Sequence, residues 1–139
     1  MNFILVIGSG AREVIIIKKL LEDAKKLDEH IEIICIKTQE NASIYNYCYK
    51  VFDIQCNVFD TMTQISEIIH FCIIGPEDPL EKQYADYFEN IKVPCIGPMQ
   101  FYAQLETSKH FCRDFLQKND ALKAYSPKFK TIYQSYKTH

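Results

Sequence analysis

The stretch FILVIGSGARE, residues 3–13, decides the fold that this sequence predicts. Its first five residues are all apolar, which is typical of a strand buried on both faces of a parallel sheet. Gly8 and Gly10 then permit a tight turn and a close approach of the backbone to a ligand. A helical pattern begins directly afterwards, so its free N–H groups lie above the strand end and suit a phosphate or carboxylate. We predict that this strand–glycine–helix unit is the ligand cradle.

Strands and helices alternate through residues 1–98. Apolar residues at helical spacing predict helices over 11–26, 60–70 and 80–90. Apolar runs predict further strands over 32–37, 71–74 and 93–96. Residues 43–48 fit either a short helix or a strand face, and a short strand is expected near 50–54. The alternation predicts an α/β fold, a Rossmann-like doubly wound, mostly parallel sheet with helices on both faces.

The pattern changes after residue 98. Two further helices are predicted over 99–105 and 108–118, with Thr107 as a candidate cap between them. Phe111, Phe115 and Leu116 form an apolar stripe on the second helix, whereas residues 121–139 show no core pattern. We therefore divide the chain into a substrate-binding domain, 1–98, and a helical linker and tail, 99–139.

Composition and charge narrow the classes of function. The formal net charge of −2 argues against a nucleic-acid partner or an anionic membrane surface. No run of about 18 apolar residues predicts a membrane span, and no signal peptide is apparent. The six cysteines show no CxxC spacing, so we expect reduced core thiols and a cytoplasmic location. The four scattered histidines and the cysteines predict no metal site.

Two loops follow predicted strands, residues 8–13 and 75–79, and both therefore belong to the carboxyl edge of the sheet, where such folds bind ligands. Arg12 suits a bidentate contact with phosphate or carboxylate, or is a solvated charge. Glu13 contacts a ligand or caps its own helix. Glu77, between two prolines, suits an amine or sugar hydroxyls, or is an ordinary surface turn.

A dinucleotide is disfavoured as the ligand. Its fingerprint needs a third glycine at position 13, and a carboxylate there would crowd a pyrophosphate. Glu40 could contact a ribose, but it lies past the end of the second strand.

Four motifs occur in one order: VIGSGARE (6–13), IIGPEDPL (73–80), IGP (96–98) and AQLETSK (103–109). With them the chain resembles, over about residues 2–126, the N-terminal domain of phosphoribosylamine–glycine ligase. This ligase, also called glycinamide ribonucleotide synthetase, belongs to the ATP-grasp superfamily and acts in purine synthesis. The resemblance implies a preATP-grasp domain that supplies part of the phosphoribosylamine or glycinamide ribonucleotide site.

The resemblance also implies site residues. The positions that carry over as substrate-binding are Gly8, Gly10, Arg12, Glu13, Glu77 and Pro79. Lys109 matches a lysine that faces the nucleotide in related enzymes. ATP and magnesium or manganese are implied for a full-length ligase, whose ATP-grasp domain would follow residues 99–139. No catalytic residue, metal ligand or cofactor is assigned to this chain, which we do not expect to be catalytic alone.

The sequence departs from the family pattern at three places. Val14 replaces the usual histidine, residues 40–43 read ENAS in place of a Gly-Asn-Ala-Gly loop, and Thr107 replaces a glycine. These departures leave open a non-catalytic binding or assembly module on the same fold. If the chain is instead part of a ligase of this family, a separate ATP-grasp domain is a candidate partner.

Overall fold

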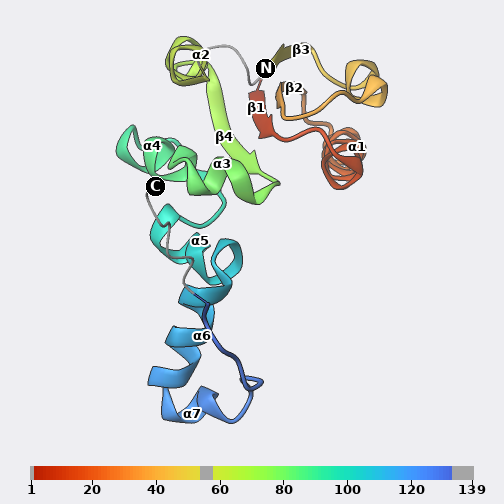
Figure 1. Cartoon of the computed structure of the whole chain (residues 1–139). Helices are drawn as coiled ribbons and strands as arrows, with labels where there is room; N and C mark the ends of the chain where they lie inside the picture. The colour runs from red at the N-terminus through yellow and green to blue at the C-terminus, as the bar shows by residue number, and fades with distance from the viewer. Residues whose placement is uncertain (1, 54–57, 133–139) are drawn as a thin grey trace, which may run out of the picture.

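A parallel sheet of five strands organises the part of the chain that the computed structural model describes, residues 2–53 and 58–132 (Figure 1). The strands are β1 (Asn2–Ile7), β2 (Ile31–Lys37), β3 (Lys50–Asp53), β4 (Ile69–Ile74) and β5 (Cys95–Ile96). Their spatial order is β3-β2-β1-β4-β5, and each neighbouring pair is parallel. β1 lies in the centre, which explains why four of its six residues are buried.

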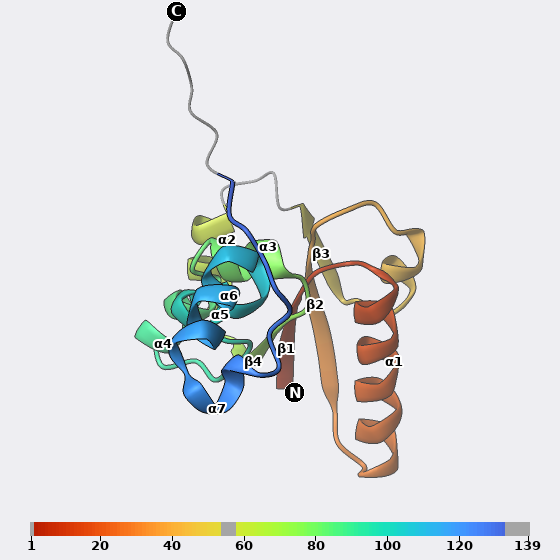
Figure 2. The same cartoon turned by 60° about the horizontal axis from the view of Figure 1, so that its bottom comes forward.

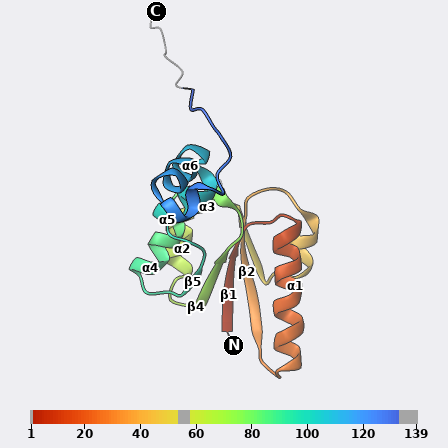
Figure 3. The ribbon, with the colours of Figure 1, turned by 90° about the horizontal axis from the view of Figure 1, so that it is seen from below.

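Helices cover both faces of this sheet, as Figures 2 and 3 show. On one face lie α1 (Ala11–Lys26) and the 3₁₀ helix η1 (Ala42–Asn46), whose apolar side chains join a core around Ile17 and Ile33. The other face carries α2 (Val58–Ile65), α3 (Glu77–Glu81) and α4 (Tyr84–Asn90). Their core surrounds Leu5 and Phe88, both fully buried. The predicted Rossmann-like α/β fold is confirmed.

The chain reverses its direction of progress across the sheet at β1. It first builds β2 and β3 on one side and then crosses to β4 and β5 on the other. In open parallel sheets such a switch point opens a crevice at the carboxyl ends of the strands. The loops that follow β1 and β4 therefore meet beside one another.

Two predicted helices are corrected by the structure. The helix expected over 60–70 is shorter, because Ile69 pairs with Phe3 in the sheet and begins β4. The helix expected over 80–90 is two helices, since Gln83 takes a left-handed conformation with φ of 64° between α3 and α4. α3 also begins inside the predicted 75–79 loop, at Glu77. Pro79 lies in the first turn of this helix, where an N–H would have no partner within the helix, so the proline does not prevent the helix from forming.

A local side-chain cap determines the secondary structure of the segment between β2 and β3. The side chain of Asn41 accepts a hydrogen bond from the Ser43 N–H, so residues 42–46 form a short helix rather than a strand face. The strand expected near 50–54 is observed as Lys50–Asp53, and residue 54 lies outside the described residues. β5 is two residues long, shorter than the predicted 93–96.

The C-terminal helices are α5 (Gln100–Thr107), α6 (Lys109–Lys118) and the unpredicted α7 (Asp120–Lys123), and they extend away from the sheet (Figure 1). Ser108, not Thr107, caps α6, because its hydroxyl accepts from the Phe111 N–H at 3.2 Å. The predicted apolar stripe is not buried, since α6 contributes no buried residue. Within the described residues, no helix is long and apolar enough to span a membrane.

Candidate functional site

The turn after β1 approaches the loop after β4 closely. Gly8 has φ of +123°, a conformation that side chains strongly disfavour, and a Cβ there would lie 2.7 Å from Cδ of Pro76. The Gly8 N–H donates to the Ile36 carbonyl at 2.9 Å, and the Gly75 N–H donates to the Ile7 carbonyl at 3.0 Å. Strand pairing therefore continues into both loops and holds them side by side.

The Glu13 side chain fills the space between these two loops. It is 3% exposed, and its Oε2 accepts a hydrogen bond from the Gly10 N–H at 2.7 Å. A Cβ at Gly75 would lie 2.6 Å from Glu13 Cδ, one at Gly8 2.9 Å from Cγ, and one at Gly10 2.8 Å from Oε2. Three of the four glycines in the chain thus make room for a single carboxylate, which caps its own helix.

Arg12 joins the same two loops from outside. Its Nε donates to Glu13 Oε1 at 3.0 Å, and its Nη2 donates to the Gly75 carbonyl. The hydrogen bond with Glu13 is the main reason why the pKa of Arg12 is raised. The side chain is still 58% exposed, so part of the guanidinium faces solvent and can receive an anion.

Ser9 ties in a third loop, the one that follows β2. Its buried hydroxyl donates to the Gln39 carbonyl at 2.6 Å and accepts from the N–H groups of Thr38 and Gln39 at 3.1 and 3.0 Å. The Asn41 side chain donates to the Ser9 carbonyl at 2.7 Å. Sequence reasoning missed this role of Ser9, and its position between two glycines is the only local signal for it.

A hollow of about 310 Å³ opens beside this network, at the lower end of the size range of small-molecule sites. It is lined by residues of the loops after β2 and β4 and by α3: Thr38, Gln39, Pro76, Glu77, Asp78, Pro79 and Lys82. Glu77 is half-buried, whereas the Pro79 side chain is buried and shapes the wall. The structure thus brings the predicted residues of both loops together around one edge of the sheet.

Lys109 is not part of that group. It lies at the start of α6 and lines a separate hollow of about 280 Å³ together with Arg113 and Lys130. Within residues 2–53 and 58–132, no group of three or more His, Cys, Asp or Glu side chains is arranged to hold a metal ion.

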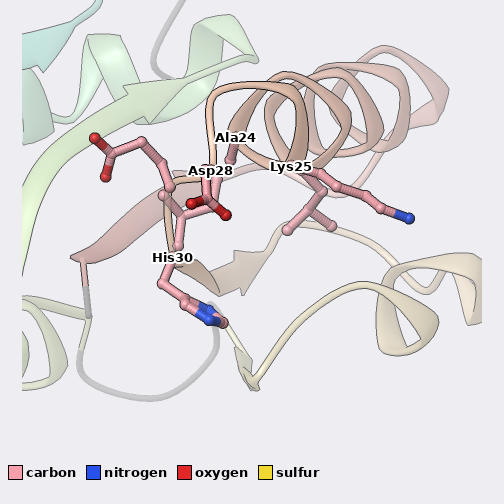
Figure 4. A pocket seen from close by; sticks show the side chains of 7 residues that line it. Ala24, Lys25, Asp28 and His30 are labelled. Atoms are coloured by element: carbon pink, nitrogen blue, oxygen red, sulfur yellow. The ribbon is translucent and has the colours of Figure 1, made fainter.

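Another hollow, of about 230 Å³, lies at the far end of α1 (Figure 4). Lys25, Asp28 and His30 line it, and all of its lining residues belong to the end of α1 and the turn into β2. One helix–strand connection therefore forms it, and it faces the amino end of the sheet. The carboxyl-edge hollow, where loops from two strands converge, is the better candidate site.

A central parallel strand, a glycine turn into a helix and a hollow at the switch point define a Rossmann-like ligand-binding domain. The chain matches the family described as "Phosphoribosylglycinamide synthetase, N domain" over residues 2–106, and it belongs to that family.

Relatives with established names support this assignment. The chain is 36% identical over 124 residues to the "Bifunctional purine biosynthetic protein purD" of Dictyostelium discoideum, covering 86% of this chain and 14% of that protein. It is 35% identical over 123 residues to the phosphoribosylamine–glycine ligase of Methanococcus maripaludis strain C7, covering 83% and 25%. The chain therefore spans a quarter or less of the length of these relatives.

A solved structure shares the fold. Against the N5-carboxyaminoimidazole ribonucleotide synthetase of Thermotoga maritima, the TM-score is 0.58 at 15% identity, covering 85% of this chain and 31% of the other. At that level of identity the likeness concerns the fold alone.

Proposed function

We propose that this chain supplies the phosphoribosylamine side of a phosphoribosylamine–glycine ligase site in purine biosynthesis. The observation that carries the proposal is the joining of the two glycine loops by Arg12 and Glu13 beside the carboxyl-edge hollow. Family membership supports it, because the named relatives are ligases of this kind. A cytoplasmic location and the division of the chain at residue 98 belong to the same proposal.

Each group at the site has a role that suits a phosphorylated sugar amine. The N–H groups of the first turn of α1 and the exposed face of Arg12 bind the phosphate. Glu77, which lines the hollow, accepts hydrogen bonds from the amine or the ribose hydroxyls. Glu13 differs from the other predicted ligands: its carboxylate is enclosed by glycines, so it acts on the ligand by holding Gly10 and Arg12 in place.

ATP and a divalent metal belong to the full-length ligase in this proposal. The described residues offer the metal no ligand set, so we assign no step through metal-bound ATP to them. Lys109, in a cationic hollow with Arg113 and Lys130, is suited to meet phosphate groups of a nucleotide held by another domain.

The second candidate is a non-catalytic binding module, which the altered Val14 and 40–43 positions favour. The structure weakens the argument from both positions. Val14 is 7% exposed and packs in the core below α1, so this substitution removes no group from the hollow. Asn41, retained in the altered loop, still holds Ser9 and caps η1. A dinucleotide is also disfavoured, since the Glu13 carboxylate fills the space that the third glycine would leave.

Calorimetry tests the proposal with ribose 5-phosphate, glycinamide ribonucleotide and NAD as ligands. Arg12→Ala and Glu77→Gln each remove a charged hydrogen bond, which contributes about 1.5–3 kcal/mol, so the Kd of a sugar phosphate rises about tenfold to a hundredfold. Arg12→Lys keeps the charge but loses the fork that joins the loops, and we expect an intermediate loss.

Lys26→Ala and Glu67→Gln are the controls, because each removes an exposed charge of the same sign from a surface outside both the carboxyl-edge hollow and the hollow at Lys109. The proposal is wrong if NAD binds more tightly than the sugar phosphates. It is also wrong if the controls weaken binding as much as the site variants do.

A further inference from the structure

Four of the six cysteines stand in two spatial pairs that their spacing in the sequence does not reveal. Cys35 is fully buried in β2 and contacts Cys48, which is half-buried in the connection between η1 and β3. Cys72 and Cys95 are direct partners in the neighbouring strands β4 and β5. All four are free thiols in this structure.

The Cys35 thiol reaches the ligand loop, residues 8–13, which leads from β1 into the first turn of α1. Its Sγ donates a hydrogen bond to the Gly8 carbonyl at 3.3 Å. Cys48 packs in the same core cluster as Cys35, and the interaction between the two thiols raises the pKa of Cys35 and lowers the pKa of Cys48. Cys48 is therefore the thiol of the pair that more readily becomes a thiolate, and thiolates are the form that oxidants attack.

We propose that Cys35 and Cys48 form a reversible disulfide that releases the carbonyl of Gly8 and so loosens the ligand loop. The oxidant is a hydroperoxide. The Cys48 thiolate attacks one peroxide oxygen and becomes a sulfenic acid, with water as the other product once the leaving hydroxide takes a proton. The Cys35 sulfur then displaces the hydroxyl group as a second water, so two thiols and one hydrogen peroxide yield one disulfide and two waters.

The other pair is less suited to this reaction. Cys72 and Cys95 are held opposite one another by the pairing of β4 with the edge strand β5, and the Cys72 N–H donates to the neighbouring Pro94 carbonyl at 2.8 Å. A disulfide demands a specific torsion about the S–S bond, which paired strands resist. Cys48 lies outside the regular strands, so no strand pairing fixes its position relative to Cys35.

Forming the disulfide removes the S–H hydrogen, which is the only hydrogen that the Cys35 side chain can donate. The Gly8 carbonyl then loses that donor next to the turn whose φ of +123° sets the direction of the ligand loop. The expected effect on sugar phosphate affinity rests on the proposed function, whereas the disulfide and the change at Gly8 do not.

Hydrogen peroxide titration of the full chain, followed by peptide mapping, tests the bond itself. We expect a loss of two mass units and a cross-linked peptide that joins residues 35 and 48. Cys48→Ser abolishes this product, whereas Cys112→Ser, the matched control on α6, leaves it unchanged. Preferential linkage of Cys72 to Cys95, or no linkage of Cys35 at all, overturns the proposal.

NMR tests the coupling without any ligand. The carbonyl carbon of Gly8 should shift on oxidation and return with dithiothreitol, while that of Gly97, outside the site, stays in place. The chain has only four glycines, so these signals are readily assigned. Oxidation should also weaken ribose 5-phosphate binding about tenfold, or about 1.4 kcal/mol, in wild type but not in Cys48→Ser. An unshifted Gly8 carbonyl overturns the coupling, whereas absent sugar phosphate binding in both redox states contradicts only the proposed function.

Discussion

In the sheet, four of the six residues of β1 are buried, whereas none of the ten residues of α6 is. The contrast extends to the segments on either side. β2 and β4 also bury four residues each, but α5 buries only Ala103 and α7 buries none. The free energy of folding therefore comes mainly from residues up to 98. The stability of α6 and α7 depends on their own capping and on their attachment to α5.

α5 is the link between the two regions. The Gln100 N–H donates to an Asp86 carboxylate oxygen at 2.8 Å, and its side chain donates to the Glu81 carbonyl at 2.9 Å. In α5 and α6, aromatic side chains such as Phe101 and Phe115 remain exposed, at 62% and 44%. The comparison teaches that a helical pattern with apolar residues does not by itself place a helix in a core.

The largest expected difference between the regions is in the loss of stability when a phenylalanine in each is replaced by alanine. Phe88 is fully buried, so Phe88→Ala should lower the free energy of unfolding by about 3–5 kcal/mol. Phe115→Ala on α6 should lower it by less than about 1 kcal/mol, because the ring is already exposed. Urea titration followed by circular dichroism measures both, and equal losses would show that α6 belongs to the cooperative core.

A smaller effect should separate two glycines. Gly75→Ala places a Cβ against the enclosed Glu13 side chain, and we expect a loss of about 2–3 kcal/mol. Gly97→Ala, where the chain passes toward α5, meets the end of the Leu80 side chain at 3.0 Å and should cost about 1 kcal/mol.

The double variant Glu13→Ala with Gly75→Ala provides the check on this cause. Removing the carboxylate makes room for the new methyl group, so the two losses should not add. Additive losses in urea titrations would mean that Glu13 is not what excludes a side chain at Gly75.

Two serines offer the same chemical change in both regions. Ser9→Ala leaves the N–H groups of Thr38 and Gln39 and the Gln39 carbonyl without their buried hydroxyl partner, and it should lower the free energy of unfolding by about 1–3 kcal/mol. Ser108→Ala removes a helix cap, worth about 1 kcal/mol, from a helix with no buried residue. Its effect should be faster hydrogen exchange at the Phe111 amide, with the urea midpoint nearly unchanged; a midpoint shift equal to that of Ser9→Ala would contradict the contrast.

The smallest effect concerns Lys37, at the end of β2. Its hydrogen bonds with Glu40 and, second, Asp53 raise its pKa above the ordinary value of 10.5. A raised pKa means that the native state holds the proton more tightly, so this stabilisation is complete below pH 10.5 and is lost as the pH rises through the folded-state pKa.

Lys37→Met should therefore differ from wild type most below that pH, and the difference should shrink in more alkaline solution. Urea midpoints across the range measure it, with Lys109→Met on α6 as the control that removes a lysine from the other region. A difference that grows with pH would contradict the assigned ion pairs.

The sequence was enough to predict the sheet, its buried strands and the edge where the two loops meet. Apolar runs report burial of a single strand, and the order of strands and helices restricts the handedness of their connections. The prediction was wrong at the ends of elements, as at Ile69 and Gln83, since partners far along the chain determine where a helix stops. The apolar stripe on α6 was also predicted from the sequence, but its pattern could not tell that none of its residues is buried among the described residues.

Residue types and their order determined that Arg12, Glu13 and Glu77 lie on loops at the carboxyl edge of the sheet. Only the tertiary structure decided that Glu13 is enclosed by three glycines from two loops, that Ser9 holds a third loop, and that Cys35 contacts Cys48. The physical reason is that a side chain's partners across the sheet depend on strand register and loop approach. Strand register and loop approach depend on several segments at once, so the local sequence pattern of one segment cannot reveal them.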